Sequence, residues 1–372
     1  MKRVIVAVTN DLVTDQRVHK VCQFLDSVGF DVLLVGRKQR KSLPLEERSY
    51  RTARMKLLFE SGPLFYAEYN IRLFLFQLLH RSQLLVANDL DTLLATWLTS
   101  RLKGNPVVYD SHEYYCGTPE LANRPFVRGI WRRIERWIFP KLKDVITVND
   151  SIAALYEKEY EKKLHVVRNI PRKQNFKGNE SRQDLGLPED KNILLLQGAG
   201  INIDRGVEEL VEAMQYVDTN TLLVILGSGD VIDILKKNVK ESGLDEKVRF
   251  IPKVPFQKLK AYTVNADFGL TVDKDTNINY RYSLPNKLFD YIHAGIPVIA
   301  SRLTEIEKII TQYNIGTFIE NHNPKHIAEV LNSTVNNKQQ RADWEQNLVK
   351  AKDELVWENE EKTLQTIYEK YR

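Results

Sequence analysis

Residues 4–35, VIVAVTNDLVTDQRVHKVCQFLDSVGFDVLLV, contain the pattern that decides the fold class. The apolar runs at 4–8 and 32–35 have the length of strands that are buried on both faces. Between them, apolar residues recur at helical spacing over 18–28, and Gly29 provides a left-handed stop. The order strand, helix, strand predicts a parallel β-α-β unit.

The same alternation continues outward from this unit along the chain. Further strands are predicted at 84–87, 107–109, 145–148, 165–167, 193–196, 222–226, 249–251, 268–272, 298–300 and 317–319. Pro171, Gly178 and several basic residues interrupt the pattern and predict a linker at 169–178. We therefore predict an α/β protein with two Rossmann-like parallel-sheet domains facing a cleft, residues 1–170 and 171–352, and a final amphipathic helix within 353–372.

The composition is that of a soluble globular protein and excludes several classes. A length of 372 residues allows about two domains, and the net charge of +5 is spread too evenly to predict a nucleic-acid partner. Two cysteines, Cys22 and Cys116, fit a reducing compartment, and with seven scattered histidines no metal site is expected. No apolar run reaches the roughly 18 residues of a membrane span, and the first run is too short for a signal peptide. We expect a cytoplasmic protein that touches a membrane from its surface only.

Open parallel sheets bind ligands at the carboxyl ends of their strands, so the residues after each strand are the candidates. Thr9, Asn10 and Asp11 follow the first strand without the G-x-G-x-x-G of a dinucleotide site, which argues against a nicotinamide enzyme. Asp89 and Asp91 follow the strand at 84–87 and either reach the cleft or are solvated turn residues.

Residues 197–206, QGAGINIDRG, follow the first strand of the second half and open a helix. Gly198, Gly200 and Gly206 would let backbone N–H groups approach a phosphate at the helix N-terminus, and Arg205 would pair with a diphosphate. The alternative is an ordinary strand-to-helix turn with a solvated arginine.

Residues 283–301, SLPNKLFDYIHAGIPVIAS, form the most specific segment. Ser283 and Pro285 suit a helix start, and Gly295 suits its end. Lys287 and Asp290 lie three residues apart on one helix face, where they would hold a phosphate and a ribose diol, or simply pair with each other.

The segment 285–301 resembles the sugar-nucleotide signature of the family 4 glycosyltransferases, which are retaining enzymes of the GT-B fold, in its P-x-K-x-x-(E/D)-Y-x-x-A-G-x-P-V form. Residues 9–36 are similar to the family's first β-α-β unit, 110–113 (DSHE) to its D-x-H-E segment, 167–171 (VRNIP) to its V-x-N-x-P exit, and 200–206 to its loop ending in (K/R)-G. The resemblance covers nearly the whole chain. It implies that the first half binds the acceptor, that the second half binds a nucleoside diphosphate sugar, and that the last helix, in 353–372, packs back on the first domain.

The resemblance also implies residue roles: Asp290 on the donor ribose, Arg205 on the diphosphate and His112 near the transferred sugar. Two positions depart from the family pattern, because Tyr282 stands where many members have a first glutamate and Gly200 where they have an arginine. The predicted catalytic residues are His112, Arg205 and Lys287. The predicted substrate-binding residues are Gly198, Gly200, Arg205, Gly206, Tyr282, Ser283, Pro285, Asn286, Lys287 and Asp290, and the acceptor-side residues are Asn10, Asp11, Asp89, His112 and Glu113.

Two segments of the first half have a second interpretation. Residues 128–141 form a basic helix with an apolar aromatic face, which suits an anionic lipid surface or a core-facing stripe with a solvated back. Residues 64–79, rich in Phe, Tyr and Leu, form a buried helix or an acceptor surface for a lipid-linked sugar.

These observations predict a retaining hexosyltransferase that needs no metal or other cofactor. It would move a sugar from a nucleoside diphosphate sugar to a glycan or lipid-linked acceptor in cell-surface polysaccharide synthesis, without a nucleic-acid partner. The alternatives are a sugar-nucleotide epimerase on the same fold, which changes the donor without an acceptor, and a non-catalytic sugar-nucleotide binding protein.

Overall fold

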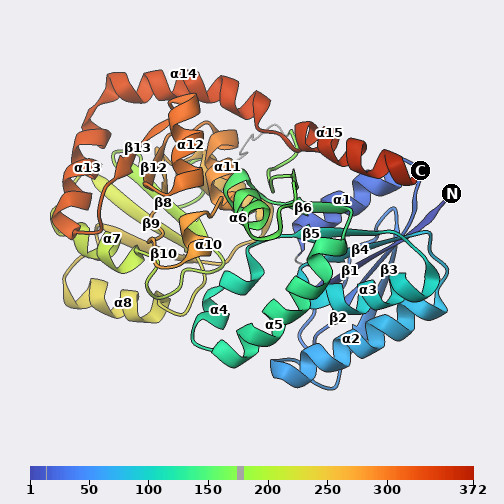
Figure 1. The fold of residues 1–372 in the computed structure, drawn as a ribbon. Coiled ribbons are helices and arrows are strands. Elements are labelled where there is room, and N and C mark those ends of the chain that lie inside the picture. The colour runs from blue at the N-terminus through green and yellow to red at the C-terminus, as the bar shows by residue number, and fades with distance from the viewer. Residues whose placement is uncertain (14, 174–179) are drawn as a thin grey trace. The chain divides into compact units, whose positions relative to one another are not determined.

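The computed structural model describes residues 1–13, 15–173 and 180–372 (Figure 1). Its contacts divide the chain into two compact units, unit 1 (Met1–Asn169 with Glu360–Arg372) and unit 2 (Ile170–Asn359). This division differs from the predicted boundary at 352/353, because Leu355 packs in the core of unit 2 and the Trp357 N–H donates to the Pro171 carbonyl at 2.8 Å. The predicted linker falls partly on residues 174–179, which lie outside the described residues.

Unit 1 contains a seven-stranded parallel sheet in the order β3-β2-β1-β4-β5-β6-β7. Its strands are β1 (Arg3–Asp11), β2 (Asp31–Lys38), β3 (Arg51–Lys56), β4 (Leu84–Asn88), β5 (Val107–Ser111), β6 (Asp144–Thr147) and β7 (His165–Val166). Its main helices are α1 (Gln16–Ser27), α2 (Gly62–Leu79), α3 (Leu90–Lys103), α4 (Pro119–Ala122), α5 (Pro125–Ile138), α6 (Asp150–Tyr160) and most of α15 (Trp357–Tyr368).

The strands predicted in this half are all present, and β3 is an additional one. Its sequence, RTARMK, has no apolar run because it lies at the sheet edge, half-exposed, and pairs only with β2. α1 covers the predicted helical segment and begins at Gln16, where the Asp15 side chain caps the Val18 N–H; Gly29 has the expected positive φ of 93°.

The C-terminal segment packs within unit 1. The Tyr368 ring of α15 lies 6.5 Å from that of Phe24 in α1 and 6.4 Å from that of Phe30. Figure 1 shows α15, in red, beside α1. Lys370 and Tyr371 donate to the Asp144 carboxylate at 2.7 and 2.5 Å, which fixes the end of the chain on β6.

Unit 2 contains a six-stranded parallel sheet in the order β10-β9-β8-β11-β12-β13. The strands are β8 (Asn192–Gly198), β9 (Thr221–Gly227), β10 (Val248–Pro252), β11 (Phe268–Thr271), β12 (Val298–Ser301) and β13 (Gly316–Ile319). The helices are α7 (Val207–Ala213), α8 (Ile232–Glu241), α9 (Phe256–Val264), α10 (Ile278–Arg281), α11 (Asn286–Ala294), α12 (Thr304–Tyr313), α13 (Pro324–Asn336) and α14 (Lys338–Glu354).

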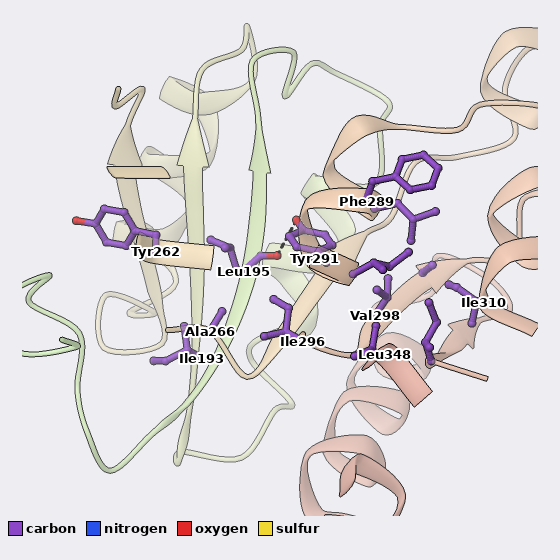
Figure 2. Close-up of a cluster of buried hydrophobic side chains, with 14 of the residues drawn as sticks. Ile193, Leu195, Tyr262, Ala266, Phe289, Tyr291, Ile296, Val298, Ile310 and Leu348 are labelled. Carbon is purple, nitrogen blue, oxygen red and sulfur yellow. Dashed lines mark hydrogen bonds between the residues drawn. The ribbon is translucent and has the colours of Figure 1, made fainter. Parts of the chain in front are cut away.

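Both faces of this sheet are covered, which explains the continuous apolar runs of its strands. In β8, Ile193 and Leu195 enter the core under α9, α11, α12 and α14, whereas Leu194 and Leu196 enter the core under α7, α8 and α13. Figure 2 shows the first of these cores, with the Tyr291 side chain of α11 directed at the Leu195 backbone. The Tyr291 hydroxyl lies 3.1 Å from the carbonyl oxygens of Leu195 and Leu270, so it anchors α11 to β8 and β11.

Candidate active site

A cavity of about 300 Å³ opens in unit 2 at the carboxyl ends of β8 and β11. It is lined by Leu196, Gln197, Gly198, Ala199, Gly200, Ile201, Arg205, Val207, Asp273, Pro285, Asn286 and Lys287. The structure therefore brings together six of the predicted substrate-binding residues, from segments more than 80 residues apart.

Two cations in this cavity share one carboxylate. The Arg205 Nε lies 2.7 Å from Asp273 Oδ1, and the Lys287 Nζ lies 3.5 Å from Asp273 Oδ2. Asp273 is almost fully buried, which by itself would raise its pKa, but Lys287 and Arg205 outweigh the burial and hold the pKa below its usual range. Two positive charges on one negative charge leave a net positive cavity wall. The solvated-arginine alternative is therefore wrong, because Arg205 pairs with Asp273, and Lys287 also pairs with Asp273.

The remaining contacts of Arg205 fix its orientation. Its Nη1 donates to the Gly200 carbonyl at 3.0 Å, and its guanidinium lies 4.7 Å from the centre of the Tyr280 ring. Gly206, the next residue, has a φ of 83°, and a Cβ there would collide with the Val272 carbonyl oxygen. Gly206 therefore serves close backbone packing, and it does not line the cavity.

The loop at 198–201 is held by a second glycine-containing loop. Ser228 N–H donates to the Gly198 carbonyl at 3.1 Å, and Ile201 N–H donates to the Ser228 carbonyl at 3.0 Å. A Cβ on Gly227 or Gly229 would collide with the backbone of this first loop. Gly227 and Gly229 therefore allow this second loop to pack closely against the loop that lines the cavity.

Asp290 lies beside the cavity and is hydrogen-bonded to Gln197, which lines it. Its Oδ2 accepts from the Gln197 Nε2 at 3.0 Å, and the Gln197 Oε1 accepts from the Thr263 hydroxyl at 2.8 Å. Neither Asp290 nor the predicted Tyr282 and Ser283 lines the cavity itself. The ribose role of Asp290 therefore stays a prediction.

A larger cavity of about 700 Å³ lies in unit 1, at the carboxyl ends of β1, β4 and β5. Its lining residues are Thr9, Asn10, Gly62, Pro63, Tyr66, Ala67, Asn70, Asp89, Asp91, Leu94, Glu113, Tyr115, Thr118, Glu120, Leu121, Arg124, Phe126, Val127, Ile130, Trp131 and Ile134. Asn10, Asp89 and Glu113 of the predicted acceptor side come together here. Asp11 does not, because it accepts from the Ser42 hydroxyl and lies 3.6 Å from the Arg54 guanidinium.

Carboxyl groups gather on the floor of this cavity. The Thr9 hydroxyl donates to Asp91 Oδ2 at 2.6 Å, and Asp91 is only 7% exposed, so the solvated-turn interpretation is wrong for this residue. Burial, together with the nearby Asp89, raises the pKa of Asp91 to about 7 and that of Glu113 to about 8. These groups therefore exist partly in the protonated form at neutral pH.

His112 lies between two carboxylates next to this floor. Its Nδ1 is 3.2 Å from Asp89 Oδ2 and its Nε2 is 3.7 Å from Asp110 Oδ2, while Arg17 pairs with Asp110 Oδ1 at 2.7 Å. Burial alone would lower the pKa of His112, but Asp89 and Asp110 outweigh it and raise the pKa to about 9. The imidazole is therefore positively charged at neutral pH.

Asp89 also holds the His112 backbone, since its Oδ1 accepts the His112 N–H at 2.8 Å. Its own backbone has φ 59° and ψ 165°, a region that glycine favours, and holding another residue there costs about 1–3 kcal/mol. The two contacts to His112 offset this strain.

The helices that contain segments 64–79 and 128–141 each have one buried apolar side and one exposed side, so the lipid-surface and acceptor-surface interpretations stay predictions. Phe65, Tyr69 and Leu73 of α2 are buried, as are Trp131 and Ile138 of α5. Outward residues of the same helices include Leu64, Leu75, Leu79, Phe126, Ile130 and Trp137, which are between 44% and 83% exposed. On the basic face, Arg132 and Arg136 lie 3.2 and 3.6 Å from Glu159.

Asp273, Gln197 and Arg17 are among the residues of these sites that were not predicted. Asp273 follows a buried strand directly, which is the signal that could have found it. No comparable signal in the sequence marks Gln197 or Arg17. The partner of a polar residue within an apolar stretch is known only once the chain has folded.

In residues 1–13, 15–173 and 180–372, none of the helices is both long enough and apolar enough to cross a bilayer. The same ranges hold no group of three or more His, Cys, Asp or Glu side chains that could bind a metal ion. Metal independence of the reaction stays a prediction.

Comparisons with known proteins match both halves of the chain. The family described as "Glycosyl transferase 4-like domain" matches residues 14–169, and "Glycosyl transferases group 1" matches residues 177–350. An uncharacterized glycosyltransferase of Methanocaldococcus jannaschii is 28% identical over 149 residues, which are 40% of this chain and 36% of that protein. The chain thus matches just over a third of that relative's length.

Solved structures of similar fold extend over the full chain. Sucrose-phosphate synthase from Thermosynechococcus elongatus has a TM-score of 0.79 at 18% identity and covers 100% of this chain and 99% of its own. Anabaena HepE in complex with UDP-glucose has a TM-score of 0.73 at 13% identity, with 99% and 100% covered. With two matched family domains and two parallel-sheet α/β units, the chain belongs to the family 4, group 1 glycosyltransferases and has the GT-B fold.

Proposed function

We propose that this chain is a retaining, metal-independent hexosyltransferase that moves a sugar from a nucleoside diphosphate sugar to a glycan or lipid-linked acceptor in cell-surface polysaccharide synthesis. The observation that carries the proposal is the convergence of Arg205 and Lys287 on Asp273 in the cavity at the ends of β8 and β11. HepE, which has a similar fold, is a precedent because it was solved with UDP-glucose.

The proposed chemistry is electrostatic. When the bond between the sugar C1 and the diphosphate oxygen breaks, negative charge accumulates on the diphosphate. A new bond from C1 to the acceptor hydroxyl oxygen forms on the same face, and the hydroxyl proton passes to the leaving diphosphate oxygen. Arg205 and Lys287 would stabilise that charge from fixed positions, because Asp273 and Gly200 orient them before the donor arrives. The Gly198–Ile201 loop would supply backbone N–H groups.

The role of His112 is proposed from the family resemblance, which implies a histidine at this position near the transferred sugar. Both of its ring N–H groups face carboxylates, those of Asp89 and Asp110, so it would act on the transferred sugar through its positive charge. The ionised imidazolium cannot act as a base at neutral pH, so we assign it a binding and charge-stabilising role.

We also propose that the protein binds reversibly to anionic membranes through α5. Phe126, Ile130 and Trp137 are exposed on this helix, beside the exposed Arg128 and Arg133. Arg132 and Arg136 contribute less, because Glu159 offsets their charge.

A panel of UDP-, GDP- and ADP-sugars in a thermal-shift assay tests the donor assignment. A donor present at about 100 times its dissociation constant should stabilise the fold by roughly 2.7 kcal/mol. Incubating the stabilising donor without an acceptor then separates the classes, since an epimerase converts it whereas a transferase leaves the sugar configuration unchanged. If no nucleotide sugar stabilises the protein, the proposed function fails.

A further inference from the structure

The cavity of unit 1 has two chemically different parts. The floor at the strand ends is polar, with Asp89, Asp91 and Glu113. The walls, contributed mainly by α2 and α5, are apolar and aromatic; they include Tyr66, Leu94, Leu121, Phe126, Val127, Ile130, Trp131 and Ile134. At about 700 Å³, the cavity has the size of a small-molecule site.

The floor holds an unsatisfied polar atom. Asp91 is 93% buried and its Oδ2 accepts from Thr9, but its Oδ1 is buried without a hydrogen-bond partner among the described residues. Buried polar atoms of folded proteins nearly always have a partner, and an orphaned one is costly. A hydroxyl group of a bound molecule would satisfy this oxygen.

The charge of the floor selects against anions. Asp89, Asp91, Glu113 and Glu120 line the cavity, and Arg124 is the single lysine or arginine among its described lining residues. Arg124 is exposed and follows α4, so it lies toward solvent rather than at the buried floor. The raised pKa values of Asp91 and Glu113 let their carboxyl groups both donate and accept, which suits uncharged hydroxyls.

The walls are preformed and continue outward. The Trp131 ring of α5 packs edge-on against the Tyr66 ring of α2 at 5.2 Å and against Tyr115 at 5.5 Å. Phe126 and Ile130, which also line the cavity, are 80% and 44% exposed. Apolar side chains that line a cavity and remain exposed to water are typical of sites for apolar ligands.

We infer that this cavity binds an amphiphile whose uncharged, hydroxyl-bearing head lies on the Asp91 and Glu113 floor and whose apolar portion lies along Tyr66, Trp131, Phe126 and Ile130. The inference rests on the proposed transferase function and deepens it by naming the class of acceptor: a glycoside with an apolar aglycone, with no phosphate or carboxylate at the floor.

Three small probes test this inference by calorimetry with the whole chain at pH 7. Octyl glucoside below its critical micelle concentration carries both parts, methyl glucoside carries the head alone, and octyl phosphate carries the tail with an anionic head. Each buried methylene contributes about fourfold in affinity, so octyl glucoside should bind at least about tenfold more tightly than methyl glucoside. It should also bind more tightly than octyl phosphate, because the floor is acidic.

Matched variants locate the binding. Phe126→Ser with Ile130→Ser should bring the affinity for octyl glucoside close to that for methyl glucoside. The control, Ile71→Ser with Leu75→Ser, changes exposed residues of α2 that do not line the cavity and should leave the affinity unchanged. Asp91→Asn removes the ionised fraction of this floor carboxyl at pH 7 while keeping its shape, so it should improve octyl phosphate binding relative to octyl glucoside.

The inference is overturned if octyl phosphate binds as tightly as octyl glucoside, if methyl glucoside matches octyl glucoside, or if the wall variant binds like wild type. Failure of octyl glucoside to bind also overturns it. Binding of a nucleoside diphosphate, measured on the same samples, separates this failure from that of the proposed function: if the nucleotide binds and the glucoside does not, only the acceptor inference falls.

Discussion

The cavities of the two units lie at the same structural position, the carboxyl ends of parallel strands. The ionisable side chains in them differ: they are mainly basic in unit 2 and mainly acidic in unit 1. In unit 2, Arg205 and Lys287 surround one carboxylate, whereas in unit 1 three carboxyl groups line the floor. The shared architecture supplies the strand ends, and the residues after the strands decide which ligand is attracted. The cationic cavity suits a diphosphate, and the acidic cavity suits uncharged hydroxyls.

The two cavities also differ in how the backbone is held. In unit 2 the residues with positive φ in the loop beside the site are Gly206, which bears no side chain to strain, and Asp204, whose φ is 61°. In unit 1 Asp89 has φ 59° and ψ 165°, and its carboxylate holds His112 at both the backbone and the ring. In unit 1 the strained residue is therefore itself part of the site.

The largest effect is expected from Asp290→Ala in unit 2. Loss of this carboxylate removes the predicted ribose contact and the partner of Gln197, and we expect transfer to fall by about 100-fold or more. The residue is only half-buried, so the fold should remain intact. The control is Asp233→Ala on α8, whose side chain is 98% exposed. Wild-type donor affinity and turnover in Asp290→Ala would show that the ribose assignment is wrong.

Arg205→Ala tests the cationic character of the same cavity. A charge-assisted contact contributes roughly 1.5 to 3 kcal/mol, so nucleoside diphosphate binding should weaken by about 10- to 100-fold, while binding of the bare nucleoside hardly changes. Calorimetry with both ligands gives the comparison, and Lys237→Ala, on the exposed face of α8, is the matched control. Equal losses for nucleoside and diphosphate would instead indicate that Arg205 shapes the pocket.

Because their ionisable groups differ, the two units should change in stability differently as the pH rises. In unit 1, the folded-state pKa values of His112, Asp91 and Glu113 are raised, to about 9, 7 and 8, so the folded unit binds more protons than the unfolded chain. Their stabilising contribution is complete below each unfolded pKa and is lost as pH rises through the folded one. Between pH 6 and 9, unit 1 should therefore lose stability, by about 3 kcal/mol from His112 alone.

Unit 2 should not follow this trend. The pKa of Asp273 is lowered, so its contribution is present above its ordinary value and is lost only in acid. Burial lowers the pKa of His293, so it disfavours folding only as pH falls below about 6.5. Hydrogen exchange at pH 6 and 9, corrected for intrinsic rates, measures each unit separately. Equal loss of protection in both units would contradict the contrast.

The smallest effect concerns the basic surface of unit 1. Arg128→Gln and Arg133→Gln should each weaken binding to anionic liposomes by roughly fivefold, because one basic residue near the surface contributes about 1 kcal/mol. Sedimentation at low and high salt should show the binding fade as salt rises. Arg101→Gln, exposed on α3, is the control. If the folded wild type does not pellet with anionic vesicles at low salt, membrane binding is excluded and a soluble acceptor is favoured.

The sequence by itself determined the parallel α/β class, most strand positions and the family signature in the second half. These features are local: a strand buried on both faces must be continuously apolar, and the segment 285–301 combines a helix start, a glycine stop and a strand within 19 residues. The edge strand β3 carries no such pattern, because only its pairing with β2 makes it a strand.

Only the tertiary structure decided which side chains share a cavity. Asp273 meets Arg205 and Lys287 because β11 lies beside β8, although these strands are 70 residues apart in sequence. Asp91, in the first turn of α3, is buried because α2 and α5 close over the end of β4, and its Oδ1 becomes an unsatisfied atom on the floor of a cavity. Which strands of a parallel sheet lie next to each other depends on the crossover connections and on how whole helices are buried. The spacing of residues along the chain does not determine this order.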